Sequence, residues 1–400
     1  MQTKRKSSLQ ELVTELQSEN LQKRDMVIPA KCLTMENGKL KVFNCGNSQE
    51  LEKILSETGI HSTESADTSI ALECMETADQ HIAEKLGIPN KYYQRMREDS
   101  IELLDNNVAH WLDRSKNNYL LRTFVDKEQK QGFARALLSD RFKTIDNYDI
   151  LLTVLEAVRE SGLNIQIDAD SCDLSEKRMY VRFICPEVEI QAPEILKNYR
   201  PDGKPNEAGT GIISGFVISN SEVGHGSFSI SPRAVVLACR NGMVRPSDKF
   251  AQRHLGAKMD EYESINWSQE TKQKNLELIL NQVKDYIKRF TSEEYLGLMV
   301  RDTIEKGSKE LQNPMDCIKA VTQSLEISED KQNSILNFFI KSGDLTGFGV
   351  QQAITLYAGK TENPDEQYEL EEVAANILDN ITVYDRPLAK KSTKSQAKLN

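Results

Sequence analysis

The segment Gly215–Val244 constrains the possible fold more than any other part of the chain. Its first half alternates apolar residues such as Phe216 and Ile218 with small ones, and a second apolar run follows a stretch rich in serine and glycine around His225. Alternation of this kind suits strand pairing, and glycines let the chain reverse between two strands. We therefore predict a hairpin with a ligand-facing loop, closed at its far end by a tight turn at Asn241-Gly242.

Helical and strand-like patterns alternate along the rest of the chain. The predicted helices cover 8–24, 68–97 with a break at 86–90, 101–115, 147–161, most of 265–340, and 369–379. The predicted strands cover 32–43 as a hairpin about Asn37-Gly38, 118–125, 131–139, 165–169 and 178–184. Helices between strand pairs predict an α+β fold, with an antiparallel sheet, helices packed on one of its faces, and a mainly helical C-terminal region.

These patterns divide the chain into four predicted parts. They are an N-terminal amphipathic helix at 1–25, an α+β core at 26–264, a helical C-terminal region at 265–385, and a disordered basic tail at 386–400. The tail contains basic residues and no acid, so two interpretations stay open. It is either a solvated extension or a weak tether to nucleic acid.

The composition is that of a water-soluble protein, with 38% hydrophobic and 28% charged residues. Neither end carries the apolar run of about 18 residues that spans a membrane, and no secretory signal is recognisable. We expect a cytoplasmic protein with no membrane partner. The net charge of −10 argues against a chain that coats nucleic acid through bulk positive charge, although a local basic groove stays compatible with it.

The cysteines predict neither a disulfide framework nor a zinc site. Seven cysteines lie far apart, without a Cys-x-x-Cys pair or a histidine at ligand spacing, and their odd number fits reduced, mostly buried thiols. The glycine-rich pieces Gly209–Gly211 and Gly224–Gly226 lack the lysine of a phosphate-binding loop and the full dinucleotide fingerprint. No cofactor and no metal ligand are therefore predicted.

Two enzymatic alternatives use the same neighbourhood. A base such as His225 beside Cys239 could generate a reactive thiolate, with Glu222 nearby in sequence. His225 and His254 with Glu222 or Asp260 could hold a metal ion if they converged. The plainer interpretation makes Cys239 a core residue of an apolar strand and His225 a turn residue.

Cationic side chains collect on or beside the candidate strands, together with flat ones. The cations are Arg135, Arg141, Lys143, Arg233, Arg240, Arg245, Lys249, Arg253 and Lys258, and the flat side chains are Phe142, Tyr148, His225 and His254. Cations along a sheet can follow a phosphate backbone, while flat side chains stack on unpaired bases. The alternative is a set of ordinary ion pairs with the many acidic residues.

Several segments together resemble the phage/plasmid-like protein family, a domain of unknown function carried by bacteriophages, plasmids and integrated elements. They are Leu86–Met96, Arg135–Asn147, Ser219–Ser227, Cys239–Met243 and Arg253–Gly256, in family-like order, and the resemblance covers roughly residues 25 to 340. The chain departs from the family pattern at Ala238 and Arg240. The resemblance implies a mobile-element setting in a bacterial host cell and no particular activity. By architecture alone, strands with a packing helix and basic strand residues also resemble single-strand annealing proteins of the eukaryotic recombination-mediator type.

The leading hypothesis is a nonenzymatic accessory that binds or anneals single-stranded DNA as a homo-oligomer. The predicted DNA-binding residues are Arg135, Arg141, Lys143, Arg233 and Arg240 for phosphate, and Phe142 and His225 for stacking. No catalytic residue is assigned. The alternatives are a thiol- or metal-dependent enzyme that uses the Glu222/His225/Cys239 region, and a host-directed module whose helical C-terminal half binds a protein partner.

Overall fold

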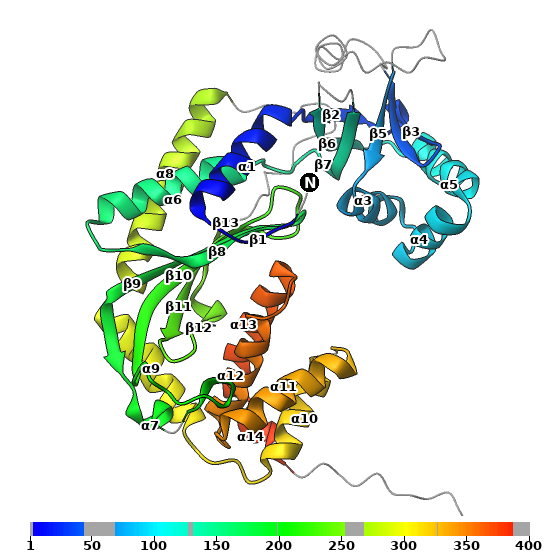
Figure 1. The fold of residues 1–400 in the computed structure, drawn as a ribbon. Helices are drawn as coiled ribbons and strands as arrows, with labels where there is room; N and C mark the ends of the chain where they lie inside the picture. Colours follow the sequence, from blue (N-terminus) through cyan, green and yellow to red (C-terminus); the bar gives the residue numbers. More distant parts are fainter. Residues whose placement is uncertain are drawn as a thin grey trace, which may run out of the picture.

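Two β-sheets and their covering helices make up the body of the protein (Figure 1). The computed structural model describes residues 3–43, 69–126, 131–197, 199–252, 268–325 and 327–386. The α+β class with a helical C-terminal region is confirmed. The strands form two sheets where the sequence predicts one, and each sheet has its own hydrophobic core.

The first sheet, called the small sheet here, has the strand order β2-β6-β7-β5-β4-β3. Its strands are β2 (Met26–Pro29), β3 (Leu33–Glu36), β4 (Lys39–Phe43), β5 (Ser69–Cys74), β6 (Asn118–Asp126) and β7 (Gln131–Ser139). The β3–β4 hairpin turns at Asn37-Gly38, as predicted, with both residues at positive φ. Asp105 accepts hydrogen bonds from both turn amides, at 2.7 and 3.0 Å, and so ties the hairpin to a helix.

Three helices cover the small sheet: α3 (Glu76–Leu86), α4 (Asn90–Asp99) and α5 (Ile101–Arg114). Gly87 ends α3 in the left-handed conformation, which confirms the predicted break. The helix predicted from residue 68 was wrong at its beginning, because Ser69–Cys74 forms β5 between β4 and β7. Ile70 and Leu72 are buried there, and their alternation with smaller residues is typical of a strand.

The second sheet, called the large sheet here, has the order β1-β8-β9-β10-β11-β12, with β13 also paired to β11. Its strands are β1 (Lys4–Ser7), β8 (Gln166–Leu174), β9 (Met179–Gln191), β10 (Gly211–Asn220), β11 (Phe228–Val236), β12 (Asn241–Val244) and β13 (Phe250–Gln252). The predicted hairpin is the β10–β11 pair, in which Ile218 lies opposite Ile230. Every residue of β10 and β11 is buried, so both faces of these strands are covered.

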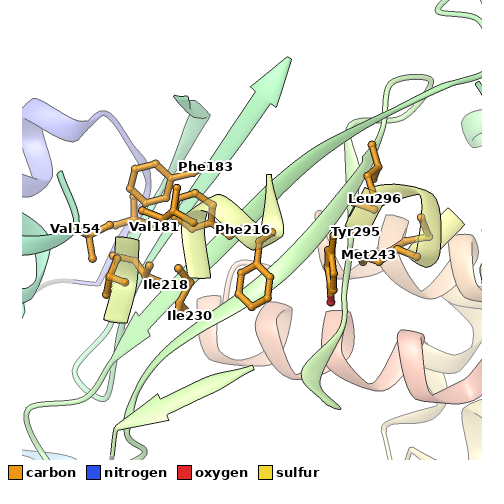
Figure 2. Packing of buried hydrophobic residues seen from close by; sticks show 14 of the residues in the cluster. Val154, Val181, Phe183, Phe216, Ile218, Ile230, Met243, Tyr295 and Leu296 are labelled. Carbon is orange, nitrogen blue, oxygen red and sulfur yellow. The ribbon is translucent and has the colours of Figure 1, made fainter. Parts of the chain in front are cut away.

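The apolar face of the large sheet packs under helices α1 (Leu9–Gln22), α6 (Asn147–Ser161) and α8 (Gln269–Phe290) (Figure 1). The rings of Phe183 and Phe216 stack with 4.7 Å between their centroids. Figure 2 shows both residues in the hydrophobic core, together with Val154 of α6. The beginning of α1 is set by Ser8, whose side chain and Glu11 form a capping box.

The remaining helices are α9 (Glu293–Gly307), α10 (Pro314–Ser324), α11 (Glu329–Ser342), α12 (Gly347–Ala358), α13 (Pro364–Asp379) and α14 (Ile381–Tyr384), with a short α7 (Pro193–Leu196) earlier in the chain. Helices α10 to α14 share a third core. Helix α12 was not predicted, because Gly343, Gly347 and Gly349 indicate a longer break; Thr346 caps the helix by accepting from the Gly349 amide. The end of the chain at 387–400, predicted to be disordered, lies outside the described residues.

Two further predictions need correction. Asn241-Gly242 does not form the turn after β11; residues 237–240 do, with Arg240 at φ +55°, and Asn241 begins β12. Cys32 is disulfide-bonded, whereas the sequence predicts reduced thiols; Cys74, Cys172, Cys185, Cys239 and Cys317 are free. Across the described ranges, no helix is both long and apolar enough to cross a membrane.

Candidate nucleic-acid interface

The glycine-rich loop between β10 and β11 is held against the β8–β9 turn. The Ser221 hydroxyl accepts from the His225 amide at 2.9 Å and donates to the Lys177 carbonyl at 2.8 Å. The Arg178 guanidinium donates to the carbonyl of His225. Gly226 has φ +145°, and a Cβ there would lie 2.7 Å from Arg178 Nη2, so the close approach requires glycine. The loop therefore presents His225 in one defined position.

His225 stacks on His81, which comes from helix α3 on the small sheet. The two ring centroids are 5.4 Å apart and the rings are inclined by 18°. His81 is buried, and neither its Nδ1 nor Nε2 of His225 has a hydrogen-bond partner in the part of the chain that the structure describes. Unpartnered buried polar atoms are rare in folded proteins and mark places where a ligand can supply the missing bond.

Both imidazoles are uncharged at neutral pH. Burial, with His225 and Lys85 nearby, lowers the pKa of His81 to about 4. Burial also lowers the pKa of His225, and the adjacent Lys177 and Arg178 lower it further. The positive charge at this place therefore belongs to the lysines and the arginine and not to the histidines. We call His81, Lys85, Lys177, Arg178 and His225 the histidine site.

Acidic groups lie beside the histidine site, but none of those in the described ranges forms a short ion pair with its lysines. Lys177 lies 3.9 Å from Glu76, and Lys85 lies 3.7 Å from its sequence neighbour Glu84. These are long ion pairs on partly exposed side chains, which contribute little to stability. Asp365 of α13 also acts electrostatically on His225, and it accepts a hydrogen bond from Tyr180 at 2.7 Å.

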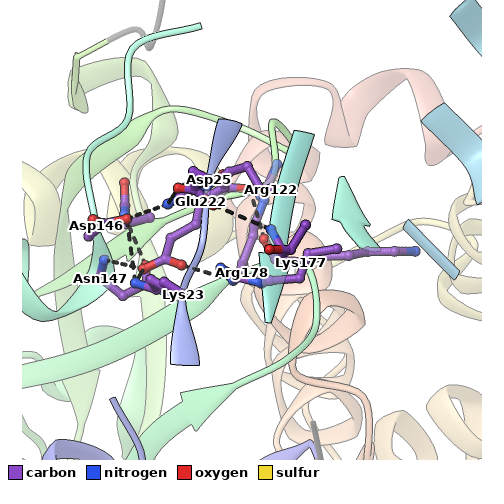
Figure 3. Close-up of polar contacts among 12 residues, drawn as sticks. Lys23, Asp25, Arg122, Asp146, Asn147, Lys177, Arg178 and Glu222 are labelled. Carbon is purple, nitrogen blue, oxygen red and sulfur yellow. Dashed lines mark hydrogen bonds and ion pairs between the residues drawn. The ribbon is translucent and has the colours of Figure 1, made fainter. Parts of the chain in front are cut away.

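A buried charge cluster lies at the other end of the same loop (Figure 3). The carboxylate of Glu222 is buried, pairs with Arg135 at 2.8 Å and Lys23 at 2.6 Å, and accepts the Asn147 amide at 2.7 Å. Burial opposes its charge, yet Arg135, Lys23 and Arg122 together hold the pKa of Glu222 well below its usual range. Glu222 is thus an anionic structural residue in this arrangement.

Arg122 connects four segments of the chain at this cluster. It is fully buried, pairs with Asp25 at 2.8 Å and Asp146 at 2.7 Å, and donates to the Glu222 carbonyl at 2.7 Å. These groups lie on β6, after α1, before α6 and in the glycine-rich loop. The cluster therefore positions the loop that carries His225 relative to both sheets.

The structure distributes the predicted DNA-binding residues over three environments. Arg135 and Arg233 are buried in ion pairs, the second with Asp168 at 2.9 Å, so their charges face carboxylates. Arg141 and Arg240 are exposed. Phe142 and Lys143 are half-buried, and a Cβ at Gly224 would lie 3.8 Å from the Phe142 ring, which places Phe142 beside the loop of His225.

The structure does not bring the residues of the thiol hypothesis together. His225 precedes β11 and Cys239 follows it, and nine strand residues span about 30 Å. The Cys239 thiol donates instead to Gln352 Oε1 at 3.5 Å. For the metal hypothesis, His254 and Asp260 lie outside the described residues, and among the residues that are described no three potential ligands gather at metal-binding distance.

Sequence reasoning missed four of the five residues of the histidine site, namely His81, Lys85, Lys177 and Arg178. His81 lies on an amphipathic helix more than a hundred residues away from His225, so no local pattern connects them. Lys177 and Arg178 lie in a plain strand turn. The one usable local signal is Gly226, because a glycine beside a histidine indicates a close approach by another group.

Comparison with protein-family models, with curated proteins and with solved structures found no match for this chain. The resemblance to the phage/plasmid-like family stays a prediction from the sequence.

Proposed function

We propose that this protein is a nonenzymatic accessory that binds single-stranded DNA through the phosphate backbone at the histidine site. The observation that carries the proposal is the convergence of Lys85, Lys177 and Arg178, from two separate elements, around two stacked uncharged imidazoles with unpartnered nitrogens. An anion with several acceptor oxygens suits this set of donors. A phosphodiester is the commonest group of that kind on an extended polymer.

The imidazoles contribute hydrogen bonds more than charge. A neutral imidazole carries one N–H donor and one acceptor, so each ring can turn a donor toward a phosphate oxygen. A phosphate held between His225 and Lys177 would also favour protonation of the ring, because an opposite charge within a few ångströms raises a histidine pKa. Binding is therefore expected to tighten as the pH falls toward 6.

The preference for single strands follows from the flat side chains beside the loop. Phe142 and His225 both border Gly224, and rings at such a position can stack on unpaired bases of any sequence. Because the chain has a net charge of −10, it attracts the phosphates of DNA only at this local cluster of cations and not over its whole surface. Binding should then depend strongly on salt.

The test is a salt series with labelled oligothymidylate and purified full-length protein. We expect Lys85→Ala with Lys177→Ala to weaken binding and to reduce the slope of log K against log salt by about 1.4, since each phosphate contact on a single strand contributes about 0.7. The matched control is Lys116→Ala with Lys319→Ala, which removes two exposed lysines far from the site in sequence.

An unchanged slope in the Lys85/Lys177 variant would refute the assignment of the site. Equal affinity for duplex and single-stranded DNA would refute the preference for single strands. Measuring the size of the free and bound protein in the same buffer tests the expected homo-oligomer.

A further inference from the structure

The large sheet has two chemically different faces. Residues opposite one another on neighbouring strands share a face, and one such row contains Tyr180, Ser219 and Ser229. The next row contains Arg182, Val217 and Ser231, and Arg233 follows beside Gly215. The intervening residues, among them Phe183 and Phe216, form the apolar core. Such alternation is typical of an antiparallel sheet with one face in water.

This polar face is nevertheless buried, because helix α13 lies over it. The ring of Tyr368 on α13 packs at a tilt against that of Tyr180, with 5.0 Å between ring centroids, and its hydroxyl is 3.2 Å from that of Ser231. Glu371 approaches Arg182, with 3.6 Å between Oε2 and Nε. Figure 1 shows α13 on the side of the sheet opposite α6 and α8.

Helix α13 is itself strongly acidic. Its sequence from Pro364 to Asp379 contains six acidic residues and no lysine or arginine. Three of the acids face cations or donors outside the helical bundle: Asp365 accepts from Tyr180, Glu371 faces Arg182, and Glu372 pairs with Lys249 at 3.2 Å. The helix thus presents a row of negative charges to a surface that carries arginines, serines and tyrosines.

Several buried polar atoms at the contact between α13 and the sheet lack hydrogen bonds within the described part of the chain. Nε and Nη2 of Arg182, Oε1 of Gln367 and Oε2 of Glu371 are buried without a hydrogen-bond partner among the described residues. Unmade bonds at buried polar atoms weaken an interface. The apolar side of α13, with Leu370, Ala374 and Ile377, packs instead on the neighbouring helices. Separation from the sheet would therefore expose these polar groups together with one small apolar cluster, formed by Tyr368 of α13 with Tyr180, Val217 and Val244 of the sheet.

The covered face is continuous with the histidine site. Arg178 and Tyr180 lie on the same stretch of chain, and Asp365 at the beginning of α13 contributes to the electrostatic environment of His225. We propose that the polar face of the large sheet is a binding surface for single-stranded nucleic acid, which acidic helix α13 occupies in the free protein. The nucleic-acid strand displaces α13, and a phosphate replaces the Glu371 carboxylate at Arg182, which keeps its ion pair with Asp173 of β8 at 2.7 Å. Tyr180 becomes a stacking surface for a base.

This inference rests on the proposed function, and one experiment separates the two. Oligothymidylate binding is compared for the full-length wild type, the variant D365N/E371Q/E372Q, and the control E329Q/E362Q/E369Q. The control removes three exposed acids, so it reproduces the change in net charge while leaving the contact of α13 with the sheet intact. Hydrogen exchange of residues 364–379 is followed in the wild type with and without the oligonucleotide.

We expect the first variant to bind about tenfold more tightly than the control, because the competing anions are weakened while the arginines remain. Adding R182Q to it should abolish that gain. In the wild type, the oligonucleotide should speed exchange in α13. Because the hydrogen-exchange measurement uses the wild-type protein, it tests the displacement of α13 even if a variant folds poorly.

Equal binding by the variant and the control, with exchange in α13 unchanged by bound oligonucleotide, would overturn the displacement of α13 and leave the histidine site in place. Absence of binding by all three proteins at low salt would overturn both proposals. Binding by the D365N/E371Q/E372Q variant alone would support occupation of the sheet face by α13 and would refute the histidine site as a binding site that is open in the wild type.

Discussion

In the part of the chain that the structure describes, Glu19 is a buried carboxyl group without the close cationic partners that surround Glu222. It lies on the buried side of α1 with 5% of its surface exposed, and neither carboxylate oxygen has a hydrogen-bond partner within the described ranges. Burial raises the pKa of Glu19 to about 7, although Arg135 opposes the shift. At neutral pH the group is therefore close to half protonated in the folded protein.

Stability should fall as the pH rises from about 4.5 to 7, because the folded protein keeps a proton on Glu19 that the unfolded chain has released. The loss is roughly 3 kcal/mol, at about 1.36 kcal/mol for each unit of pKa. Glu19→Gln should remove this dependence and stabilise the protein at pH 8, as measured by urea unfolding at several pH values. His81 contributes the opposite trend between about 6.5 and 4, since its pKa is lowered, and that trend should persist in the variant. An identical pH profile for variant and wild type would contradict the assignment.

At the scale of elements, the pairing of β9 and β10 depends on one glycine. A Cβ at Gly215 would lie 2.3 Å from the carbonyl oxygen of Phe183, a backbone atom that cannot rotate away. By contrast, a Cβ at Gly297 in helix α9 would meet the Arg301 side chain at 3.4 Å and Ile190 at 3.6 Å, which are ordinary contacts. The same substitution should therefore have opposite effects at the two positions.

Gly215→Ala should destabilise the protein by about 1–3 kcal/mol, because the two strands must move apart to admit the methyl group. Gly297→Ala should stabilise it by up to about 1 kcal/mol, since alanine favours the helix. Thermal unfolding of both variants and the wild type measures the two changes in stability. A neutral Gly215→Ala would mean that the strands are packed more loosely than this geometry requires.

At the scale of the whole molecule, the two sheets have separate hydrophobic cores, and the buried charge cluster lies where they meet. Arg122 of the small sheet pairs with Asp146 before α6 and with the loop of Glu222 after β10. Apolar burial stabilises each sheet by itself. The polar cluster fixes the orientation of one sheet against the other, together with a small apolar contact of Val223 with Leu120, Ala136 and Leu138.

Arg122→Met should destabilise the protein by about 3–5 kcal/mol, since it leaves Asp25 and Asp146 without their buried partner. It should also separate the unfolding of the sheets, so that amides of β7 and β10 lose protection from hydrogen exchange at different urea concentrations. Arg159→Met, which removes an exposed arginine of α6, is the control. Simultaneous loss of protection in the Arg122 variant would indicate that other contacts couple the cores.

Local patterns in the sequence determined the elements, because each pattern reports on its own neighbourhood. The alternation around Phe216 predicted β10, Asn37-Gly38 predicted the β3–β4 turn, and the apolar spacing of 147–161 predicted α6. Where two local signals competed, the prediction failed: Asn241-Gly242 is typical of a turn, yet pairing with β11 draws it into a strand.

Only the tertiary structure decided which side chains meet. Nothing local connects His81 with His225 or Glu371 with Arg182, because contacts between distant segments depend on how whole elements pack. For the same reason, sequence alone could not tell a free arginine from a paired one: Arg141 is exposed, whereas Arg135 is buried against Glu222. The sequence determines which side chains carry a charge or an aromatic ring. The packing of two sheets and an acidic helix determines where a ligand could reach these side chains.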